Sequence, residues 1–277
     1  MITIVTDSTS YIKKSEAREL GVRIIPMSYT VSDQIYGESY SDQNGDFENL
    51  LSGSAVCSTS QPNMSAFLSC FEEELSMGNE VLCITISSRL SGTYSTAYMA
   101  ARQIEDGGDK VIVVDSHNTA GGLYILVKAA QGMVCGGLGL ADIKGRLIEM
   151  RDRILTVFSV EDMDPLRRSG RIGFVRMSVG TILNKRPILL LREGAVVSSG
   201  MAHGDTDVIR KLVQMTDKDA DEFIINYIGN NRLAANLYGV LKNARPSAQI
   251  GLHKAGPVLG IHLGMNVISV SYLGLGG

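Results

Sequence analysis

The sequence predicts an α/β protein of two domains, an N-terminal domain with a parallel sheet and a C-terminal mixed α+β domain. Three observations lead to this class. Short apolar runs alternate with amphipathic stretches through the first half of the chain, which is typical of βαβ units. The pattern changes near residue 155, where hairpin-like strands begin. The length of 277 residues is enough for one large domain or two smaller ones.

The first half alternates predicted strands with predicted helices. Four runs with the short, apolar character of buried strands are residues 2–5, 22–29, 81–86 and 111–114. Stretches with apolar residues at helical spacing lie before Gly21, from Pro62 onward, over residues 94–104 and twice between residues 123 and 153. The polar segment 32–45 is expected to be a loop.

The second half predicts a different architecture. Residues 188–191 and 195–197 flank Glu193-Gly194, which is typical of an antiparallel hairpin. Strands near 223–227 and 249–253 alternate with one helix near 233–244. We therefore expect domains at residues 1–155 and 156–277, with a ligand between them, because domain interfaces are common small-molecule sites.

Composition excludes several classes of protein. The net charge is −3 and there is no Trp, so the chain lacks the basic face and stacking aromatics of nucleic-acid binders. The four cysteines form no C-x-x-C pair and are expected to be buried free thiols. We see neither a signal peptide nor a membrane-spanning run, so a cytoplasmic protein is expected.

The usual signatures of catalysis are missing. The sequence contains no phosphate-binding loop, no dinucleotide fingerprint and no nucleophile elbow. Its four histidines show no metal-ligand spacing. We therefore expect no catalytic residue, no metal and no cofactor. A binding protein without catalytic activity of its own is therefore the leading hypothesis. The alternatives to it are an enzyme with its own phosphotransferase or hydrolase activity, and a small-ligand regulatory module.

Two clusters of hydroxyl residues remain, at residues 58–62 and 87–94, each just before a predicted helix. Ser and Thr commonly cap helices, and spacing alone favours that interpretation. The other interpretation is an anion site, because hydroxyls and free N–H groups at the start of a helix bind anions well. Both loops can lie at the carboxyl ends of the parallel strands, where α/β proteins bind ligands.

The same segments resemble the DegV family of fatty-acid-binding proteins. The resemblance covers essentially the whole chain through four motifs in the expected order: residues 4–10, residues 59–62, residues 86–94, and Ser169-Gly170-Arg171-Ile172 ahead of residues 186–189. It implies a long-chain fatty acid of palmitate or oleate size as the ligand. Some members are the lipid-carrying, non-catalytic subunit of a bacterial fatty acid kinase, which implies a separate kinase as a possible partner.

The resemblance also implies site residues. Thr59 and Ser91 are expected to bind the carboxylate directly, with Ser60, Gly92 and His262 in support. Arg171 is the expected contact for docking the kinase. A structural histidine, in place of a ligand contact, is an equal alternative for His262.

Simpler roles also remain open for other residues. Arg171 is favoured slightly as a solvated surface residue, and Asp7 and Ser8 equally suit the cap of the first helix. The chain departs from the family at Tyr227-Ile228-Gly229 and near His203. Met265-Asn266 stands where the family has Pro-Gly. These departures affect the expected kinase partnership more than lipid binding.

Overall fold

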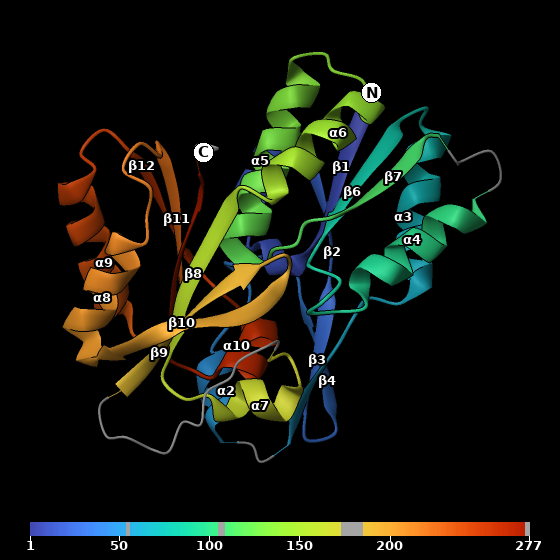
Figure 1. Cartoon of the computed structure of the whole chain (residues 1–277). Coiled ribbons are helices and arrows are strands. Elements are labelled where there is room, and N and C mark those ends of the chain that lie inside the picture. The colour runs from blue at the N-terminus through green and yellow to red at the C-terminus, as the bar shows by residue number, and fades with distance from the viewer. Residues whose placement is uncertain (54–55, 105–108, 173–184, 275–277) are drawn as a thin grey trace.

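The structure, a computed structural model, describes residues 1–53, 56–104, 109–172 and 185–274. It contains two large sheets and one small sheet, with helices around and between them (Figure 1). The chain has an α/β fold with a parallel-sheet N-terminal domain and a mixed-sheet C-terminal domain, so the predicted fold class is confirmed. The proposed division after residue 155 falls within the first strand of the second sheet.

The N-terminal sheet is fully parallel. Its strands, in spatial order, are β2 (Val22–Ile25), β1 (Ile2–Asp7), β6 (Glu80–Thr85) and β7 (Val111–Asp115). Helices α3 (Met64–Ser76) and α4 (Thr93–Gln103) cover one face. Helices α1 (Lys14–Leu20), α5 (Ala120–Cys135) and α6 (Leu140–Arg151) pack on the other face. The predicted helix stop is confirmed, because Gly21 takes the left-handed conformation after α1.

The C-terminal sheet has six strands and mixed directions. Their order is β10 (Ala195–His203), β9 (Lys185–Arg192), β8 (Ile154–Val160), β13 (Val267–Leu273), β11 (Glu222–Ile228) and β12 (Gln249–Lys254). Only β11 and β12 are parallel neighbours among these described strands. Helices α8 (Gly204–Gln214) and α9 (Asn231–Ala244) cover its outer face. The helix expected near residues 233–244 is confirmed as α9, whereas α8, which packs here through Val208 and Leu212, was not predicted.

Two predictions for the N-terminal half were wrong. The apolar run 22–29 forms two strands, because Pro26, which has no N–H to donate, separates β2 from β3 (Met27–Val31). The predicted loop 32–45 contains β4 (Gln34–Glu38), which is largely exposed up to its buried last residue, Glu38, and has no run of apolar residues to reveal it. Strands β4, β3 and β5 (Cys57–Ser60) form a small antiparallel sheet.

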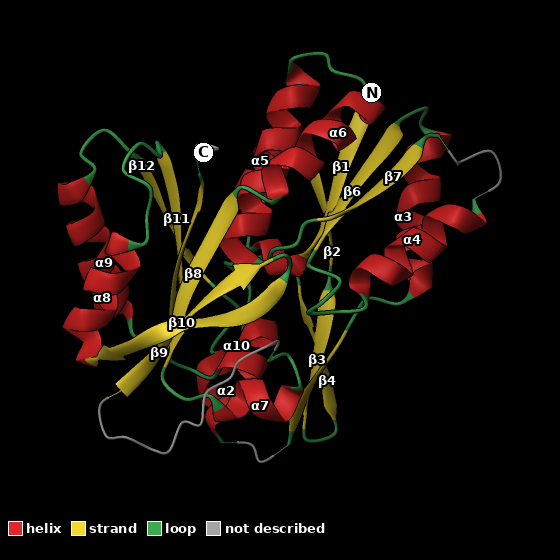
Figure 2. Cartoon of the chain, viewed as in Figure 1, coloured by secondary structure: helices red, strands yellow, loops and turns green. Residues whose placement is uncertain are grey.

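Four short helices complete the described fold: η1 (Ser8–Ser10), α2 (Phe47–Ser52), α7 (Asp164–Ser169) and α10 (Pro257–Leu263). The last three lie together beneath the two large sheets, beside the small sheet (Figure 2). They contribute to one apolar cluster that also contains residues of β3, β8, β9 and β13. The small sheet and α10 are therefore packed against the place where the two large sheets meet.

Helix α5 joins the two large sheets. Residues 120–127 are all buried, and Leu123, Leu126 and Val127 are inaccessible to solvent. The cluster around them contains residues of the parallel sheet and also Ile224 of β11. A helix that is apolar on every side is stable only when it is covered on every side. The two sheets provide that cover from opposite directions (Figure 2).

The predicted hairpin is confirmed and makes a second connection between the sheets. Glu193 and Gly194 both have positive φ, as expected for a tight two-residue turn between β9 and β10. The hydroxyl of Ser87, in the loop after β6, donates a hydrogen bond to the carbonyl of Gly194 at 2.8 Å. This contact fixes the hairpin tip against the loop that precedes Ser91.

Candidate functional site

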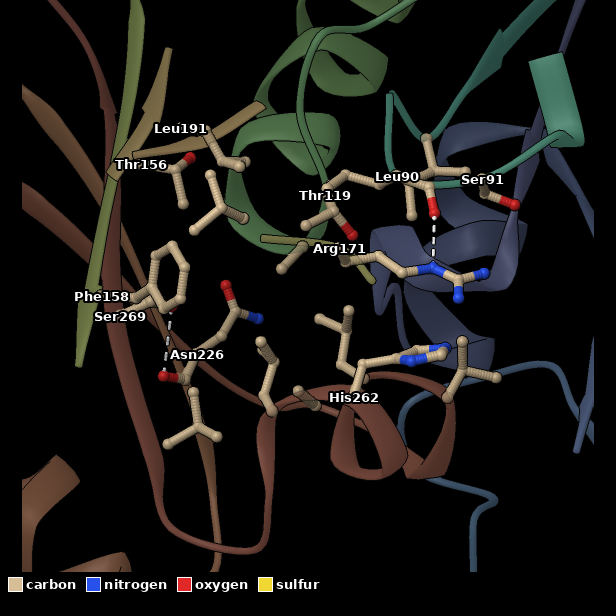
Figure 3. Close-up of a pocket in the computed structure, with 18 of the residues that line it drawn as sticks. Leu90, Ser91, Thr119, Thr156, Phe158, Arg171, Leu191, Asn226, His262 and Ser269 are labelled. Atoms are coloured by element: carbon tan, nitrogen blue, oxygen red, sulfur yellow. Dashed lines mark hydrogen bonds between the residues drawn. The ribbon is translucent and has the colours of Figure 1, made fainter. Parts of the chain in front are cut away.

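A cavity of about 150 Å³ lies between the two large sheets, at the start of α5. Most of its lining is apolar and comes from the C-terminal sheet, the small sheet, α10 and the loop after β6; examples are Met27, Ile86, Phe158, Leu191, Val196 and Leu263. Polar side chains lie at two places in it (Figure 3). Ser91, Arg171 and His262 occupy one side, and Thr156, Asn226 and Ser269 occupy the other.

A second, more open cavity of about 590 Å³ adjoins the first. Its lining includes Arg168, Ser58 and Ser169 as well as apolar residues of α10. Thr59, Arg171 and His262 line both cavities, so the two cavities meet at these three residues. We call this place the junction. We call the first cavity the inner cavity and the second the outer cavity. A molecule that fills the inner cavity would reach the outer cavity through the junction.

Thr59 and His262 are in direct contact at the junction. Thr59 Oγ1 lies 2.7 Å from His262 Nε2, which joins β5 to α10. The other ring nitrogen, Nδ1, is buried and has no hydrogen-bond partner among the described residues. Burial, and secondarily the nearby Arg171 guanidinium, lowers the pKa of His262 to about 4. The imidazole is therefore neutral near pH 7, with one ring nitrogen protonated.

Ser91 approaches the junction from the loop between β6 and α4. Its hydroxyl lies 2.8 Å from Thr93 Oγ1 and accepts a hydrogen bond from the Thr93 N–H at 3.3 Å. Gly92 allows close contact with the other hydroxyl segment, because a Cβ at Gly92 would lie 2.2 Å from Gln61 Oε1. The two hydroxyl-rich segments, far apart in sequence, therefore meet at one cavity.

The capping interpretation of these segments applies only in part. Ser91 does accept from an N–H at the start of α4, so it has a local structural role. Residues 57–60 form a strand, however, and Asn63 is the residue that caps α3. Thr59 lines both cavities, whereas Ser60 is exposed and lines neither.

Arg171 lies over the junction. It follows Gly170, whose left-handed conformation ends α7, and its Nε donates to the carbonyl of Leu90 at 3.3 Å (Figure 3). Arg171 is exposed, with its guanidinium beside the loop that carries Ser91. A fixed positive charge therefore accompanies the neutral donors of the junction.

Asp7 and Ser8 have structural roles and line neither cavity. One Asp7 oxygen accepts from the N–H of Thr9 at the start of η1, and the other accepts from the N–H of Ile86 at 2.7 Å. The Ser8 hydroxyl donates to Glu38 at 2.9 Å. These contacts hold the loops that follow β1 and β6 in register.

Helix α10, which carries His262, is held by buried polar groups that the sequence did not point to. Glu38 is fully buried and accepts from the N–H of Val258 at 2.9 Å. The buried Tyr11 hydroxyl accepts from the N–H of Leu259 at 3.3 Å. N–H groups in the first turn of a helix have no partner within it, so these two side chains satisfy and position that turn. Glu38 lies in the segment expected to be a loop, and no motif marked it.

The departures from the family motifs lie in different places. Tyr227 lines the inner cavity, and Met265 lines the outer cavity. His203 is exposed at the start of α8, where its N–H donates to Asp207, and it lines neither cavity. Of the departures, Tyr227 and Met265 therefore bear on the shape of the cavities.

Within the part of the chain that the structure describes, no group of three His, Cys, Asp or Glu residues could hold a metal ion. None of the described helices combines the length and the apolar character that crossing a bilayer requires.

All four cysteines are free thiols; Cys70 and Cys83 are buried as expected, whereas Cys135 is exposed.

The buried Glu38 carboxyl makes stability depend on pH. Burial raises its pKa from 4.5 to about 7, against the opposing effect of its hydrogen bonds. The folded protein therefore binds this proton more tightly than the unfolded chain does. We expect this group's contribution to the free energy of unfolding to fall as the pH rises from 4.5 to above 7, by roughly 3 kcal/mol.

Glu38→Gln should remove that fall, because the amide oxygen can still accept from Val258 and the amide N–H can donate to Ser8. The measurement is urea denaturation of both proteins at about pH 5 and about pH 8. The difference between the two proteins isolates Glu38 from other titrating groups. An equal loss of stability in both proteins would show that Glu38 is ionised throughout this range.

The sequence of this chain is similar to one protein family along almost its whole length. The family model described as "Uncharacterised protein, DegV family" matches residues 1–274. A DegV domain-containing protein of Halalkalibacterium halodurans is 31% identical over 278 residues, which cover 98% of each chain. One of Deinococcus radiodurans is 30% identical over 281 residues, which cover 98% of this chain and 97% of that protein.

Solved structures show the same fold. A Thermus thermophilus structure, described as fatty acid binding of a DegV family protein, has a TM-score of 0.87 at 29% identity and covers 99% of both chains. A stearic-acid-binding protein from Eubacterium ventriosum has a TM-score of 0.88 at 20% identity, over 99% of this chain and 98% of that one. Together with the family match over almost the whole length, these similarities show that the chain belongs to the DegV family.

Proposed function

We propose that this protein binds a long-chain fatty acid, with the carboxylate at the junction and the tail in the inner cavity. The observation that carries the proposal is the pairing of an apolar cavity with a neutral donor cluster at one side of it, formed by Thr59, Ser91 and His262. An acyl chain needs the apolar cavity, and a carboxylate needs the hydrogen-bond donors.

The Thr59–His262 pair has one unused donor in either tautomer of the imidazole. If Nδ1 carries the proton, the Thr59 hydroxyl donates to Nε2, and Nδ1–H, which has no partner among the described residues, remains. If Nε2 carries the proton, it donates to Thr59, and the Thr59 O–H remains. Ser91 and the Arg171 guanidinium add donors nearby. A carboxylate is acceptor-only, so it suits this set of groups.

The tail supplies most of the binding free energy. Each methylene removed from water contributes about 0.8 kcal/mol, so a long chain in the apolar cavity binds strongly without a large number of polar contacts. The fatty-acid-binding description of the Thermus thermophilus relative and the stearic-acid-binding description of the Eubacterium ventriosum structure support the same class of ligand.

The lining favours a carrier over an enzyme with its own phosphotransferase or hydrolase activity. Among the described residues that line the two cavities there is no carboxylate and no lysine. Phosphoryl transfer needs carboxylate ligands for Mg²⁺ and groups that hold a triphosphate. The described lining offers neither, so we propose that this chain presents the lipid and that any chemistry on it belongs to a partner.

Delipidated protein should bind palmitate or stearate at micromolar concentration, and Thr59→Val or Ser91→Ala should weaken that binding about tenfold or more. Each variant removes a hydrogen bond to a charged group, which contributes about 1.5–3 kcal/mol. Ser60→Ala is the matched control, because Ser60 is on the same strand as Thr59 but lines neither cavity. Isothermal titration calorimetry measures all four proteins. Equal affinity in all of them would remove Thr59 and Ser91 from the site.

We further propose that the partner is a separate fatty acid kinase that approaches through the outer cavity. Arg168 and Arg171 line that cavity, and the planar guanidinium of an arginine pairs well with carboxylates and phosphates. A carboxylate at the junction would be the group that such a partner reaches. Arg171 lines both cavities and therefore lies at the junction, whereas Arg168 lines only the outer cavity.

Arg171→Ala should therefore lower acyl-phosphate formation about tenfold when loaded protein, ATP and the kinase of the same cell are mixed. Arg167→Ala is the control, because Arg167 is exposed on α7, pairs with Asp164 and lines neither cavity. Acyl-phosphate is trapped with hydroxylamine, and the amount of hydroxamate formed is measured. Equal rates in the two variants would remove Arg171 from the docking surface. Turnover of ATP by this chain alone would overturn the carrier proposal.

A further inference from the structure

The inner cavity contains a second polar place that the head-group site does not use. Asn226 of β11 is 3% exposed and lines the cavity. Neither its amide nitrogen nor its amide oxygen has a hydrogen-bond partner among the described residues. Figure 3 shows its amide directed into the cavity, on the side away from Arg171 and His262. A buried amide without partners is costly and needs a reason.

Thr119 is the second open group. It precedes α5, and its hydroxyl makes no capping bond and is buried without a partner among the described residues. Figure 3 shows that hydroxyl directed into the same cavity. The neighbouring hydroxyls are already used, since Thr156 bonds to Asn118 and Ser271 at 2.9 Å each, and Ser269 donates to the Asn226 carbonyl at 3.3 Å. Among the buried described side chains that line the inner cavity away from the junction, Asn226 and Thr119 are therefore the ones whose polar atoms have no partner.

The local structure accommodates the amide. Asn226 stands between Ile224 and Ile228 on the face of β11 that is turned to α5 and the cavity, where apolar residues are otherwise the rule. A Cβ at Gly121, in the first turn of α5, would lie 2.8 Å from the Asn226 amide oxygen. Glycine at this position therefore leaves room for the amide.

We propose that the fatty acid bound by this protein carries a hydroxyl group along its chain, which pairs with Asn226 and Thr119. The inference rests on the proposed function and specifies the ligand of the same cavity. A saturated tail offers no partner to these polar atoms. A hydroxyl both donates and accepts, so it can donate to the Asn226 oxygen while accepting from its N–H or from Thr119.

The test compares stearate with a positional series of monohydroxylated stearates, by competition on the delipidated full-length protein. At least one isomer should bind about tenfold more tightly than stearate, because only that position brings the hydroxyl to Asn226. Weaker or equal binding of every isomer would overturn the proposal and would be the result if an ordered water satisfies the amide. Failure of every acid to bind, stearate included, would instead count against the proposed function.

Two variants locate the effect. Asn226→Leu should abolish the preference for the hydroxylated isomer, because leucine fills similar space without polar atoms. Thr119→Val, which keeps the shape of the side chain, should reduce the preference. Asn243→Leu, at an exposed position of α9, is the control and should leave the preference unchanged. A preference that persists in both Asn226→Leu and Thr119→Val would overturn the proposal.

Discussion

The arrangement of the molecule depends on the burial of α5. Its first two turns are apolar on every side and are buried completely, so the helix is stable only between two covering layers. The parallel sheet supplies one layer and the mixed sheet supplies the other. The cavity lies where the helix begins, because Thr119 and Ala120 line it together with residues of the mixed sheet and of the loop after β6. The same packing that joins the two domains thus leaves the space in which a ligand can lie between them.

The site also requires that α10 be held in position. Glu38 and Tyr11 are buried side chains from the N-terminal domain, and they bind the first-turn N–H groups of a helix near the end of the chain. His262 extends from that helix to Thr59 of the small sheet. Burying the Glu38 carboxyl costs stability near neutral pH, as its raised pKa indicates. The same contacts hold the first turn of α10, and the helix places His262 at the junction.

The sequence predicted the fold class well because buried strands and helices have strong patterns. The hydroxyl-rich segments around Thr59 and Ser91 could be recognised by their motifs, and the structure places both at one cavity. Strand β4 was missed because an exposed strand need not be apolar. Glu38 and Asn226 were missed for another reason. A single polar residue acquires its meaning from neighbours distant in the sequence, and no local spacing reveals a partner 220 positions away, as Val258 is from Glu38.

The central claim is that a carboxylate lies against a neutral imidazole at the junction, and the charge of His262 reports it most directly. Nitrogen-15 NMR of the histidine side chains in delipidated protein should show His262 neutral, with a pKa well below 6.5. Adding stearate should raise that pKa, because an adjacent anion favours the charged imidazolium. Stearyl alcohol, which has the same tail and no charge, should leave it low. A His262 pKa that responds equally to the acid and the alcohol, or to neither, would contradict the account.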